Sequence, residues 1–414
     1  MLRPGQVFST EKGQRVEIQG FAGSGSQGDV YRARGTDGRA LAMKVFQDAS
    51  ESQRIRTAFT VRNLAGLSPA VLAPIDRVLA PDMLATVSPF IAGSTLETWL
   101  QESPRAGDLK LRLVMAIGLA AAVESFHAKG WTPGDLGSDQ FIVEETPSLA
   151  KVRMVDVDSV VADGIPVPKT LGKLPYFSPE LRKAFLGGGS HPITPQSDLF
   201  SLGVLLHEVL LLRHPAEGYV DPEEIDSYHR VMSAGWPGDP LAGHGGEPEG
   251  LSGFSVATLD PNTQRILRLA LHPKPSMRPS AAAMKTTLGS ALCRMTTCPA
   301  CSCWVIAFNG LSRCPHRGCA APFRSPRLCG QGFSVVLDRP ELILGRAEFP
   351  DPHVSRRHLR IRTMGPCIEI ENIGSNGTFI REGEGWSRMA DGTPRILRQG
   401  DRILLGNLEL RLAA

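Results

Sequence analysis

The sequence contains no apolar run long enough to cross a membrane, and it carries very little net charge. Its longest apolar stretch, residues 202–212, includes His207 and Glu208 and falls well short of the ~20 residues that a spanning helix needs. The N-terminal segment also lacks the continuous apolar core of a secretory signal. The formal net charge of +3 is too small to indicate nucleic acid or a membrane as a partner. We therefore expect a cytoplasmic protein that binds neither.

Cysteines are scarce outside one short segment. Five of the eight fall between Cys298 and Cys319. Clustering at short spacings, in a sequence without a secretory signal, is typical of metal binding rather than of disulfides. We interpret the outlying Cys293, Cys329 and Cys367 as ordinary apolar residues.

The chain has 414 residues, of which 42% are apolar and 21% charged, so two or three globular domains are expected. The first part alternates strand-like runs such as Ala40–Phe46 with helix-like runs such as Leu111–His127. A Cys/Pro-rich segment follows, and in the last part short apolar runs alternate with turn residues, as in an all-β sandwich. The predicted parts are residues 1–293, 294–330 and 331–414.

A glycine-rich segment near the N-terminus is the first motif that indicates chemistry. It places Gly23, Gly25 and Gly28 just before Val30, and Lys44 follows on the next strand-like run. Glycines let a hairpin backbone lie close over phosphates, and a lysine supplies positive charge to them. Glycine triplets also occur in ordinary turns, but the added valine and lysine predict a nucleotide site.

These residues resemble those of protein kinases, and the resemblance continues in order to about residue 290. Asp135 is similar to the aspartate of the catalytic loop, and Asp156 in Val-Asp-Val-Asp stands in the place of the D-F-G aspartate. Glu180 resembles the A-P-E glutamate, Asp198 the buried aspartate of a large helix, and Arg278 the late arginine that pairs with that glutamate. The resemblance implies an α+β bilobal protein-kinase fold, with a small lobe at about 1–90 and a large lobe at about 91–293.

The same resemblance implies the chemistry of the site. Asp135 would accept the proton of the substrate hydroxyl, and Lys44 would hold ATP phosphates. Gln140 and Asp156 would bind Mg²⁺. The implied nucleotide-binding residues are Gly23, Gly25, Gly28, Val30, Lys44, Gln140 and Asp156.

The catalytic segment departs from the family pattern at three positions. The lysine that usually follows the base by two residues is replaced by Gly137, so one positive charge near the transferred phosphoryl group is missing. Gln140 stands where the metal-binding asparagine is usual, and its amide oxygen is carried on a longer arm. Asp158 replaces the glycine of D-F-G, either as an extra metal ligand or as a turn residue.

The small-lobe glutamate that should orient Lys44 is also missing from its expected place. The best register puts Thr60 there, and Glu51 lies about two helical turns upstream. Lys44 would then be held by Asp156 or by a carboxylate that the sequence does not identify.

Two functions are compatible with these departures. The first is an active serine/threonine kinase that uses ATP and Mg²⁺, and the second is a pseudokinase that binds nucleotide and serves as a scaffold. Lys44, Asp135 and Asp156 are all retained, and phosphoryl transfer depends mainly on positioning and charge. The sequence therefore favours the enzyme.

A closer resemblance is to a bacterial kinase-like group, through Val-Asp-Val-Asp-Ser at 155–159 and Pro-Tyr-Phe-Ser-Pro-Glu-Leu at 175–181. Members of that group occur beside a von Willebrand A-type protein and a metal-dependent protein phosphatase, in tellurite-resistance-like signalling sets. The resemblance implies these two proteins as partners.

Two pairs of cysteines in the middle segment have the spacing of metal-binding turns. Paired thiolates on two turns can bind one tetrahedral Zn²⁺, and a segment this small needs metal in order to fold. His316 or Cys303 is a possible substitute for one ligand. The predicted structural zinc ligands of this zinc-ribbon-like knuckle are Cys298, Cys301, Cys314 and Cys319.

The last part carries a series of short motifs in a fixed order. Arg346 follows Leu-Gly, Ser355 begins Ser-Arg-Arg-His, and Asn376 lies in Gly-Ser-Asn-Gly-Thr, before a final Gly-Asp at 400–401. This order resembles the forkhead-associated (FHA) domains, all-β sandwiches whose loops bind phosphothreonine. An arginine, a hydroxyl and an amide brought together by loops would supply hydrogen-bond donors to a phosphate dianion.

By resemblance, Arg346 and Ser355 would hold the phosphate, while Ser375 and Asn376 would fix the peptide backbone. Arg356 would help with either. We expect His358 to brace the Ser355 loop rather than to contact ligand.

The sequence thus predicts a multidomain signalling protein with a kinase fold, a zinc knuckle and an FHA sandwich. The predicted function is phosphorylation of serine or threonine on a partner protein, with docking to a phosphothreonine-containing protein.

Overall fold

The computed structural model describes residues 1–25, 27–80, 83–165, 172–189, 192–216, 239–241, 255–316 and 318–413. The chain divides into two compact units, which are described separately. The first comprises Met1–Ala106, Leu111–Gly245 and Ile266–Thr286, and the second Gly107–Lys110, Gly246–Arg265 and Thr287–Ala414.

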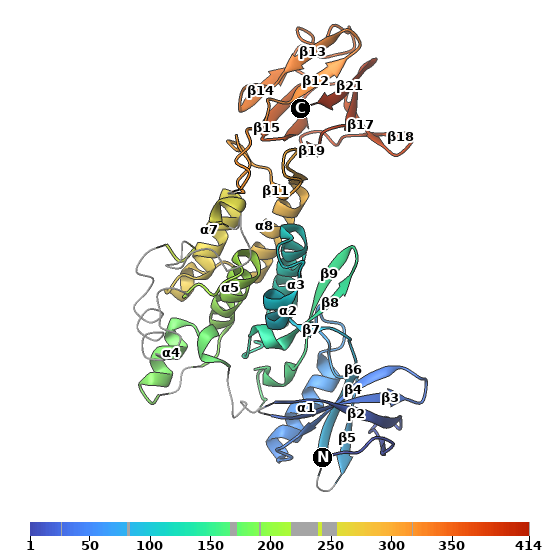
Figure 1. The fold of residues 1–414 in the computed structure, drawn as a ribbon, viewed down its shortest axis with the longest axis vertical. Helices are drawn as coiled ribbons and strands as arrows, with labels where there is room; N and C mark the ends of the chain where they lie inside the picture. The colour runs from blue at the N-terminus through green and yellow to red at the C-terminus, as the bar shows by residue number, and fades with distance from the viewer. Residues whose placement is uncertain are drawn as a thin grey trace. The chain divides into compact units, whose positions relative to one another are not determined.

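The first unit begins with a six-stranded antiparallel sheet, drawn in blue in Figure 1, with helix α1 (Glu51–Asn63) packed on it. Strand β4 coincides with the predicted strand, and its buried Leu41 and Met43 alternate with Lys44 on the opposite face, as the two-residue period of a strand requires. The strands in sheet order are β1 (Val7–Ser9), β2 (Arg15–Gly25), β3 (Gly28–Gly35), β4 (Ala40–Phe46), β6 (Met83–Pro89) and β5 (Asp76–Ala80).

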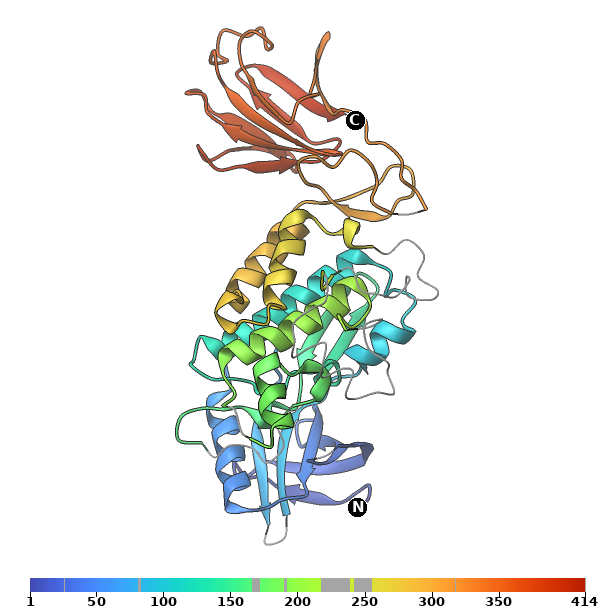
Figure 2. The same ribbon diagram turned by 90° about the vertical axis from the view of Figure 1, so that its left-hand side faces the viewer.

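The rest of the kinase-like region is mainly helical, as Figure 2 shows. Helix α5 (Pro195–Leu211) is almost entirely buried and begins at a capping box formed by Thr194 and Ser197, which satisfies backbone donors at its first turn. Arg112 of α3 donates to the carbonyl of Leu210 at 2.8 Å, so α3 and α5 lie side by side. Among the described residues, no helix is both long enough and apolar enough to cross a bilayer.

The other helices and strands of this region range from a few residues to the 19 residues of α3 (Leu109–His127). The α-helices are α2 (Leu96–Glu102), α3 (Leu109–His127), α4 (Pro179–Leu186), α7 (Pro261–Ala270) and α8 (Ala281–Cys293). A small sheet is formed by β7 (Ser94–Thr95), β8 (Phe141–Thr146) and β9 (Leu149–Met154). Short 3₁₀ helices are η1 (Ser138–Gln140), η2 (Val157–Ser159), η3 (Leu174–Tyr176), η4 (Val256–Thr258) and η5 (Pro275–Met277).

The predicted pairing of Arg278 with Glu180 and the predicted burial of Asp198 are both present in the large lobe. Arg278 donates to both carboxylate oxygens of Glu180, at 2.6 and 2.8 Å, a bidentate geometry that is among the stronger hydrogen-bonded ion pairs. Asp198 is buried and accepts hydrogen bonds from His127 at 3.1 Å and from the backbone N–H of Gly134 at 3.2 Å. These contacts anchor the segments on either side of the candidate catalytic loop.

The second unit contains the cysteine-rich segment and a β-sandwich. A two-stranded sheet of β10 (Met295–Thr297) and β11 (Trp304–Ile306) opens the cysteine-rich segment. The sandwich has a six-stranded sheet in the order β13 (Phe333–Val336), β12 (Arg327–Gly330), β21 (Leu408–Ala413), β20 (Arg402–Leu405), β17 (Thr378–Glu382) and β18 (Gly385–Arg388). Its second sheet has four strands in the order β14 (Glu341–Leu344), β15 (Leu359–Met364), β16 (Cys367–Asn372) and β19 (Arg395–Leu397). Its core is formed by apolar residues from both sheets, including Leu328, Ile361, Ile370, Ile403 and Leu410.

The sandwich begins earlier than the predicted boundary at residue 331, which falls in the turn between two of its strands. Strand β12 (Arg327–Gly330) already pairs with β13 (Phe333–Val336) and with β21 (Leu408–Ala413). The buried Leu328 of β12 lies in the sandwich core, so β12 belongs to the sandwich.

Candidate functional site

A cavity of about 500 Å³ lies between the six-stranded sheet and the large lobe. This volume is within the range of about 300–1,000 Å³ that is usual for small-molecule sites. Part of its wall is apolar, with Val30, Ala42 and Ile142, whereas its polar part carries Lys44 and Gln140. An apolar slot that ends in charged groups suits a flat base attached to phosphates.

The glycine-rich hairpin covers part of this cavity, and its glycines differ in what they do. A Cβ atom on Gly28 would lie 2.1 Å from the carbonyl oxygen of Val45, so only glycine fits beside β4. A Cβ on Gly23 would meet nothing within 4 Å, and one on Gly25 would meet only the oxygen of Gly28 at 3.9 Å. Gly28 therefore lets the hairpin pack closely against β4, while Gly23 and Gly25 place no side chain in the open space at the cavity.

Lys44 points into the cavity and is held by three side chains. Its ammonium forms ion pairs with Asp156 and with Asp158, the latter at 2.9 Å, and donates to Gln27 Oε1 at 3.2 Å. Burial alone would lower the pKa of Lys44, but the charges of Asp158 and Asp156 outweigh burial and raise the pKa to about 12. The lysine is therefore positively charged at any physiological pH and fixed in position.

Asp158 supplies the carboxylate that the sequence did not identify for Lys44. It is buried in η2, and α1 contributes no carboxylate to the contacts of this lysine among the described residues. Thr60 is buried and bonds to Thr57 within its own helix, at 3.0 Å. Arg56, one turn before Thr60, instead donates to the carbonyl of Asp158 and, at 3.2 Å, to that of Val160.

The candidate catalytic loop contains three buried oxygen atoms without hydrogen-bond partners among the described residues. They are Asp135 Oδ1, Asp139 Oδ1 and Gln140 Oε1. Buried acceptors without partners are costly in a folded protein. They are expected where a cation or a hydrogen-bond donor arrives with a ligand.

The surroundings of Asp135 suit a general base. Burial raises its pKa, opposed by a hydrogen bond from Gln140, and the charges of Asp156 and Asp139 raise it further while that of Lys173 lowers it. The net effect is a raised pKa. A carboxylate with a raised pKa takes up a proton more readily when a neighbouring hydroxyl is attacked.

The oxygen atoms near the phosphate end of the cavity fit Mg²⁺. Gln140 and Asp156 both line the cavity, and Mg²⁺ takes oxygen ligands from one or two carboxylates together with substrate phosphates. The buried Gln140 Oε1 without a partner is the atom that a cation would satisfy. Asp156 has a left-handed backbone, with φ 57°, a conformation that aspartate adopts more readily than most residues.

In the β-sandwich, the motif residues converge at two loops. The loop between β14 and β15 carries Arg346 and Ser355, and the loop between β16 and β17 carries Ser375 and Asn376. Ser355 Oγ lies 3.3 Å from Ser375 Oγ and accepts from its backbone N–H at 3.2 Å. Asn376 Nδ2 donates to the carbonyl of His353 at 2.6 Å. The structure therefore brings both loops into one exposed site.

The two arginines of this site differ in how they are held. Arg346 donates from Nε to the carbonyl of Val354 at 2.9 Å and from Nη2 to that of Pro352 at 2.8 Å, so its guanidinium has a fixed direction while it stays exposed. Arg356 is exposed next to Ser355. An arginine whose position is fixed in advance loses less conformational entropy when it binds an anion.

His358 lies beneath the site, where the sequence predicted a bracing role. Its Nδ1 accepts from the backbone N–H of Ser355 at 3.0 Å, and its Nε2 is 3.0 Å from the carbonyl of Gly377. Burial lowers the pKa of His358, which keeps the ring neutral so that one nitrogen accepts and the other donates. A Cβ on Gly374 would lie 2.7 Å from this ring, so glycine is required there.

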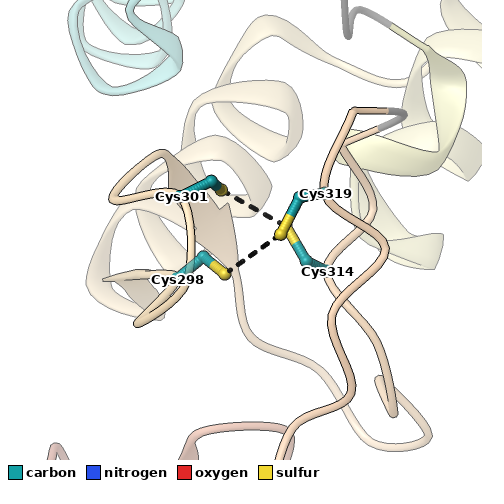
Figure 3. A group of neighbouring side chains, drawn as sticks. All are labelled: Cys298, Cys301, Cys314 and Cys319. Carbon is teal, nitrogen blue, oxygen red and sulfur yellow. Dashed lines mark hydrogen bonds between the residues drawn. The ribbon is translucent and has the colours of Figure 1, made fainter.

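The four predicted zinc ligands form one cluster. Their Sγ atoms all lie within 4.8 Å of one another, and Figure 3 shows the side chains directed toward a common centre. The Sγ atoms of Cys298 and Cys319 are 3.8 Å apart, as are those of Cys301 and Cys314. Sulfurs at the corners of a tetrahedron with bonds of about 2.3 Å are separated by roughly 3.8 Å, whereas a disulfide requires about 2.05 Å. The donor set and its geometry therefore fit Zn²⁺.

The two alternative ligands that the sequence left open lie outside this cluster. Cys303 is exposed, and the ring of His316 lies 3.1 Å from the carbonyl of Trp304.

Comparison with known proteins agrees with this geometry. The family model described as "Protein kinase domain" matches residues 16–287. The chain belongs to the protein kinase domain family. A second family model, described as "FHA domain", matches residues 334–406, which contain all five predicted phosphopeptide-binding residues. The chain therefore consists of a kinase domain followed by an FHA domain.

Several bacterial serine/threonine kinases are similar to the kinase domain. Serine/threonine-protein kinase AfsK of Streptomyces coelicolor is 30% identical over 205 residues, which cover 46% of this chain and 24% of AfsK. Serine/threonine-protein kinase pkn2 of Myxococcus xanthus is 28% identical over 219 residues, covering 50% of this chain and 25% of pkn2. Probable serine/threonine-protein kinase PknB of Lactococcus lactis is 25% identical over 228 residues, covering 53% and 34%. The match thus spans between 24% and 34% of these relatives' lengths.

Sequence reasoning missed three residues that contact the candidate site residues or the segments that carry them. Gln27 joins the glycine-rich hairpin to Lys44 and, through Nε2, to Ser159 Oγ at 3.3 Å. Arg56 joins α1 to the segment after Asp156. Lys173 forms an ion pair with Asp139. Each contact joins residues far apart in the sequence, and only the charge of Lys173 before the Ser-Pro-Glu motif was a usable signal.

Proposed function

We propose that the chain is a serine/threonine protein kinase, which transfers the γ-phosphate of ATP to a hydroxyl group of a partner protein. The observation that carries this proposal is that Lys44, Gln140 and Asp156 line one cavity of nucleotide size, while Asp135 is hydrogen-bonded to Gln140. The names of the bacterial relatives support the same reaction class.

The residues of the cavity have separate tasks in this reaction. Lys44, fixed by its carboxylate partners, places a positive charge against the phosphates. Gln140 and Asp156 would hold Mg²⁺, which offsets the negative charge of the phosphates during transfer. Asp135 accepts the proton of the acceptor hydroxyl. Most of the catalysis then comes from positioning and charge stabilisation.

Phosphate transfer from labelled ATP tests the proposal directly. The full chain, incubated with Mg·ATP and a protein rich in serine and threonine, should incorporate phosphate into hydroxyl side chains. Chelating Mg²⁺ should stop incorporation, because the oxygens of Gln140 and Asp156 would then lack the cation that bridges them to ATP. Nucleotide binding without any transfer would favour the alternative, a pseudokinase scaffold. Gly137 and Gln140, which stand in place of the usual lysine and asparagine of the catalytic loop, motivate that alternative.

We further propose that the FHA domain binds phosphothreonine on a partner protein or on the kinase itself. Arg346 would hold the phosphate together with Ser355, while Ser375 and Asn376 would hold the peptide backbone, with help from Arg356. The fixed guanidinium beside two exposed hydroxyls supports this assignment, because phosphate dianions bind most strongly to charged donors.

Arg346→Ala should weaken phosphothreonine-peptide binding by roughly 10- to 100-fold, since a charge-assisted hydrogen bond contributes about 1.5–3 kcal/mol. Fluorescence anisotropy with a phosphothreonine peptide library measures the change. Arg402→Ala is the matched control, because Arg402 is also exposed but pairs with Glu409 on β20 and β21, away from the two loops in sequence. Unchanged binding in Arg346→Ala, or equal losses in both variants, would remove Arg346 from the site.

The partners and the structural metal remain proposals of the same kind. We propose Zn²⁺ at the four cysteines as a structural ion. A von Willebrand A-type protein and a metal-dependent phosphatase are the proposed partners, on the resemblance of residues 155–159 and 175–181 to the bacterial group described above.

A further inference from the structure

The catalytic loop lacks the positive charge that accompanies the base in most relatives of this fold, and its geometry disfavours any side chain there. Gly137 is extended, with φ −152°. A Cβ on Gly137 would lie 3.0 Å from Asp139 Oδ1 and 3.4 Å from the ring of Tyr176. A side chain at this position would therefore require Asp139 to shift by a few tenths of an ångström.

A lysine from another segment lies against the same loop. Lys173 forms an ion pair with Asp139 Oδ2, and Asp139 belongs to the same loop as Asp135. Its side chain is 46% exposed, which leaves the ammonium accessible from solvent. Asp139 also lines the nucleotide cavity and keeps its second oxygen without a partner among the described residues.

The backbone that carries Lys173 is fixed by several contacts. Its carbonyl accepts from the backbone N–H of Tyr176 at 2.9 Å, at the start of η3. The Tyr176 hydroxyl donates to Ser138 Oγ at 2.8 Å, which ties η3 to the catalytic loop. Arg182 donates to the carbonyl of Leu174 at 2.6 Å. These hydrogen bonds hold the backbone at Lys173 in place next to the catalytic loop.

Asp139 brings the charge of Lys173 to the nucleotide cavity. Asp139, Gln140 and Asp156 all line that cavity, and the ammonium of Lys173 pairs with Asp139. The charge of Lys173 therefore lies beside the residues proposed to hold Mg²⁺ and the phosphates.

We propose that Lys173 takes the place of the missing catalytic-loop lysine and supplies positive charge at the site of phosphoryl transfer. This inference rests on the proposed kinase activity. In the transfer, the acceptor oxygen forms a bond to the γ-phosphorus, and the bond from that phosphorus to the β–γ bridging oxygen breaks, its electron pair leaving with ADP. The hydroxyl proton passes to Asp135, and Lys173 keeps its protons throughout.

The first test compares variants of the full chain under saturating Mg·ATP. Lys173→Ala and Lys173→Gln should each lower kcat by about 100-fold, the order expected when one stabilising donor is removed. The KM for ATP should stay within about twofold, since Lys44 and the glycine-rich hairpin are intact. Lys173→Arg keeps the charge and should lose little. Lys151→Ala, which removes an exposed lysine on β9, is the matched control and should behave as wild type.

Comparison of the charged and neutral variants separates this role from a structural one. Lys173→Arg should keep most of kcat, whereas Lys173→Gln should lose it, and amide exchange of residues 172–189 should be the same in both. A variant that only loosened the fold would lose activity together with its protection from exchange.

Moving the charge back to the loop is the most direct test. In Lys173→Ala, Asp139 is released from its ion pair and is able to make room for a side chain at residue 137. Adding Gly137→Lys to Lys173→Ala should therefore raise kcat at least about tenfold above that of Lys173→Ala alone. Failure of this restoration, or an unchanged kcat in Lys173→Ala, would overturn the inference while wild-type transfer still stands. No transfer by wild type would overturn the proposed kinase activity and this inference together.

Discussion

Asp135→Asn should lower the rate of phosphoryl transfer by about 10²–10⁴-fold, the range for loss of a positioned general base. The amide has the same shape as the carboxylate but does not accept the hydroxyl proton. Asp135 Oδ1 is buried without a partner, so no structural hydrogen bond known for that atom is lost. ATP binding should be unchanged, because Lys44 and the cavity walls are untouched.

The measurement is kcat from labelled phosphate incorporation, with ATP affinity followed in parallel by a fluorescent nucleotide analogue. Asp163→Asn is the control, since Asp163 is exposed in a turn of the same lobe. If Asp135→Asn transferred phosphate at the wild-type rate, Asp135 would not be the base. If wild type and variant were equally inactive yet both bound nucleotide, the scaffold function would be correct.

Loss of metal from the four-cysteine cluster should unfold the cysteine-rich segment. The described core of this cluster is small: Cys298, Val305 and Cys314 are buried, with Phe323 packed against them. Zinc binding contributes on the order of 10–16 kcal/mol in isolated zinc-finger peptides, far more than a core of this size supplies. Without the ion, four thiols at van der Waals distance would have little to hold them together.

Metal analysis of the purified chain should find one zinc per molecule, and Cys301→Ser combined with Cys314→Ser should remove it. The double variant should also expose residues 295–323 to proteolysis and to rapid amide exchange. Cys303→Ser is the matched control, because Cys303 is exposed and outside the cluster. Absence of zinc from the wild type, or equal loss in the control, would contradict the assignment.

Much of the architecture could be predicted from sequence because its signals are local. The cysteine pairs are separated by short turns, so their spacing alone indicated a cluster, and the structure places the four Sγ atoms together. The two motif loops of the sandwich were likewise recognised from short runs of sequence. The predicted sandwich boundary missed β12, because its pairing with β21 at the end of the chain has no local sign.

The contacts around Lys44 could not be predicted, since they depend on distant segments. Asp158 lies 114 positions from Lys44, and as a replaced glycine it was equally compatible with a metal ligand or a turn. The structure gives it a role that neither alternative covered. Lys173 was missed for the same reason, because its partner Asp139 is brought near only by the folding of η3 onto the catalytic loop.

The placement of Asp158 has a consequence for how such an enzyme would be switched. In most protein kinases the lysine pairs with a glutamate on the small-lobe helix, so rotation of that helix makes or breaks the pair. Here both carboxylates that pair with Lys44 belong to the segment 156–158. Helix α1 contacts this part of the chain through Arg56, which donates to the backbone carbonyls of Asp158 and Val160. A regulator acting on α1 would therefore displace the lysine's partner and the candidate metal ligand in a single movement.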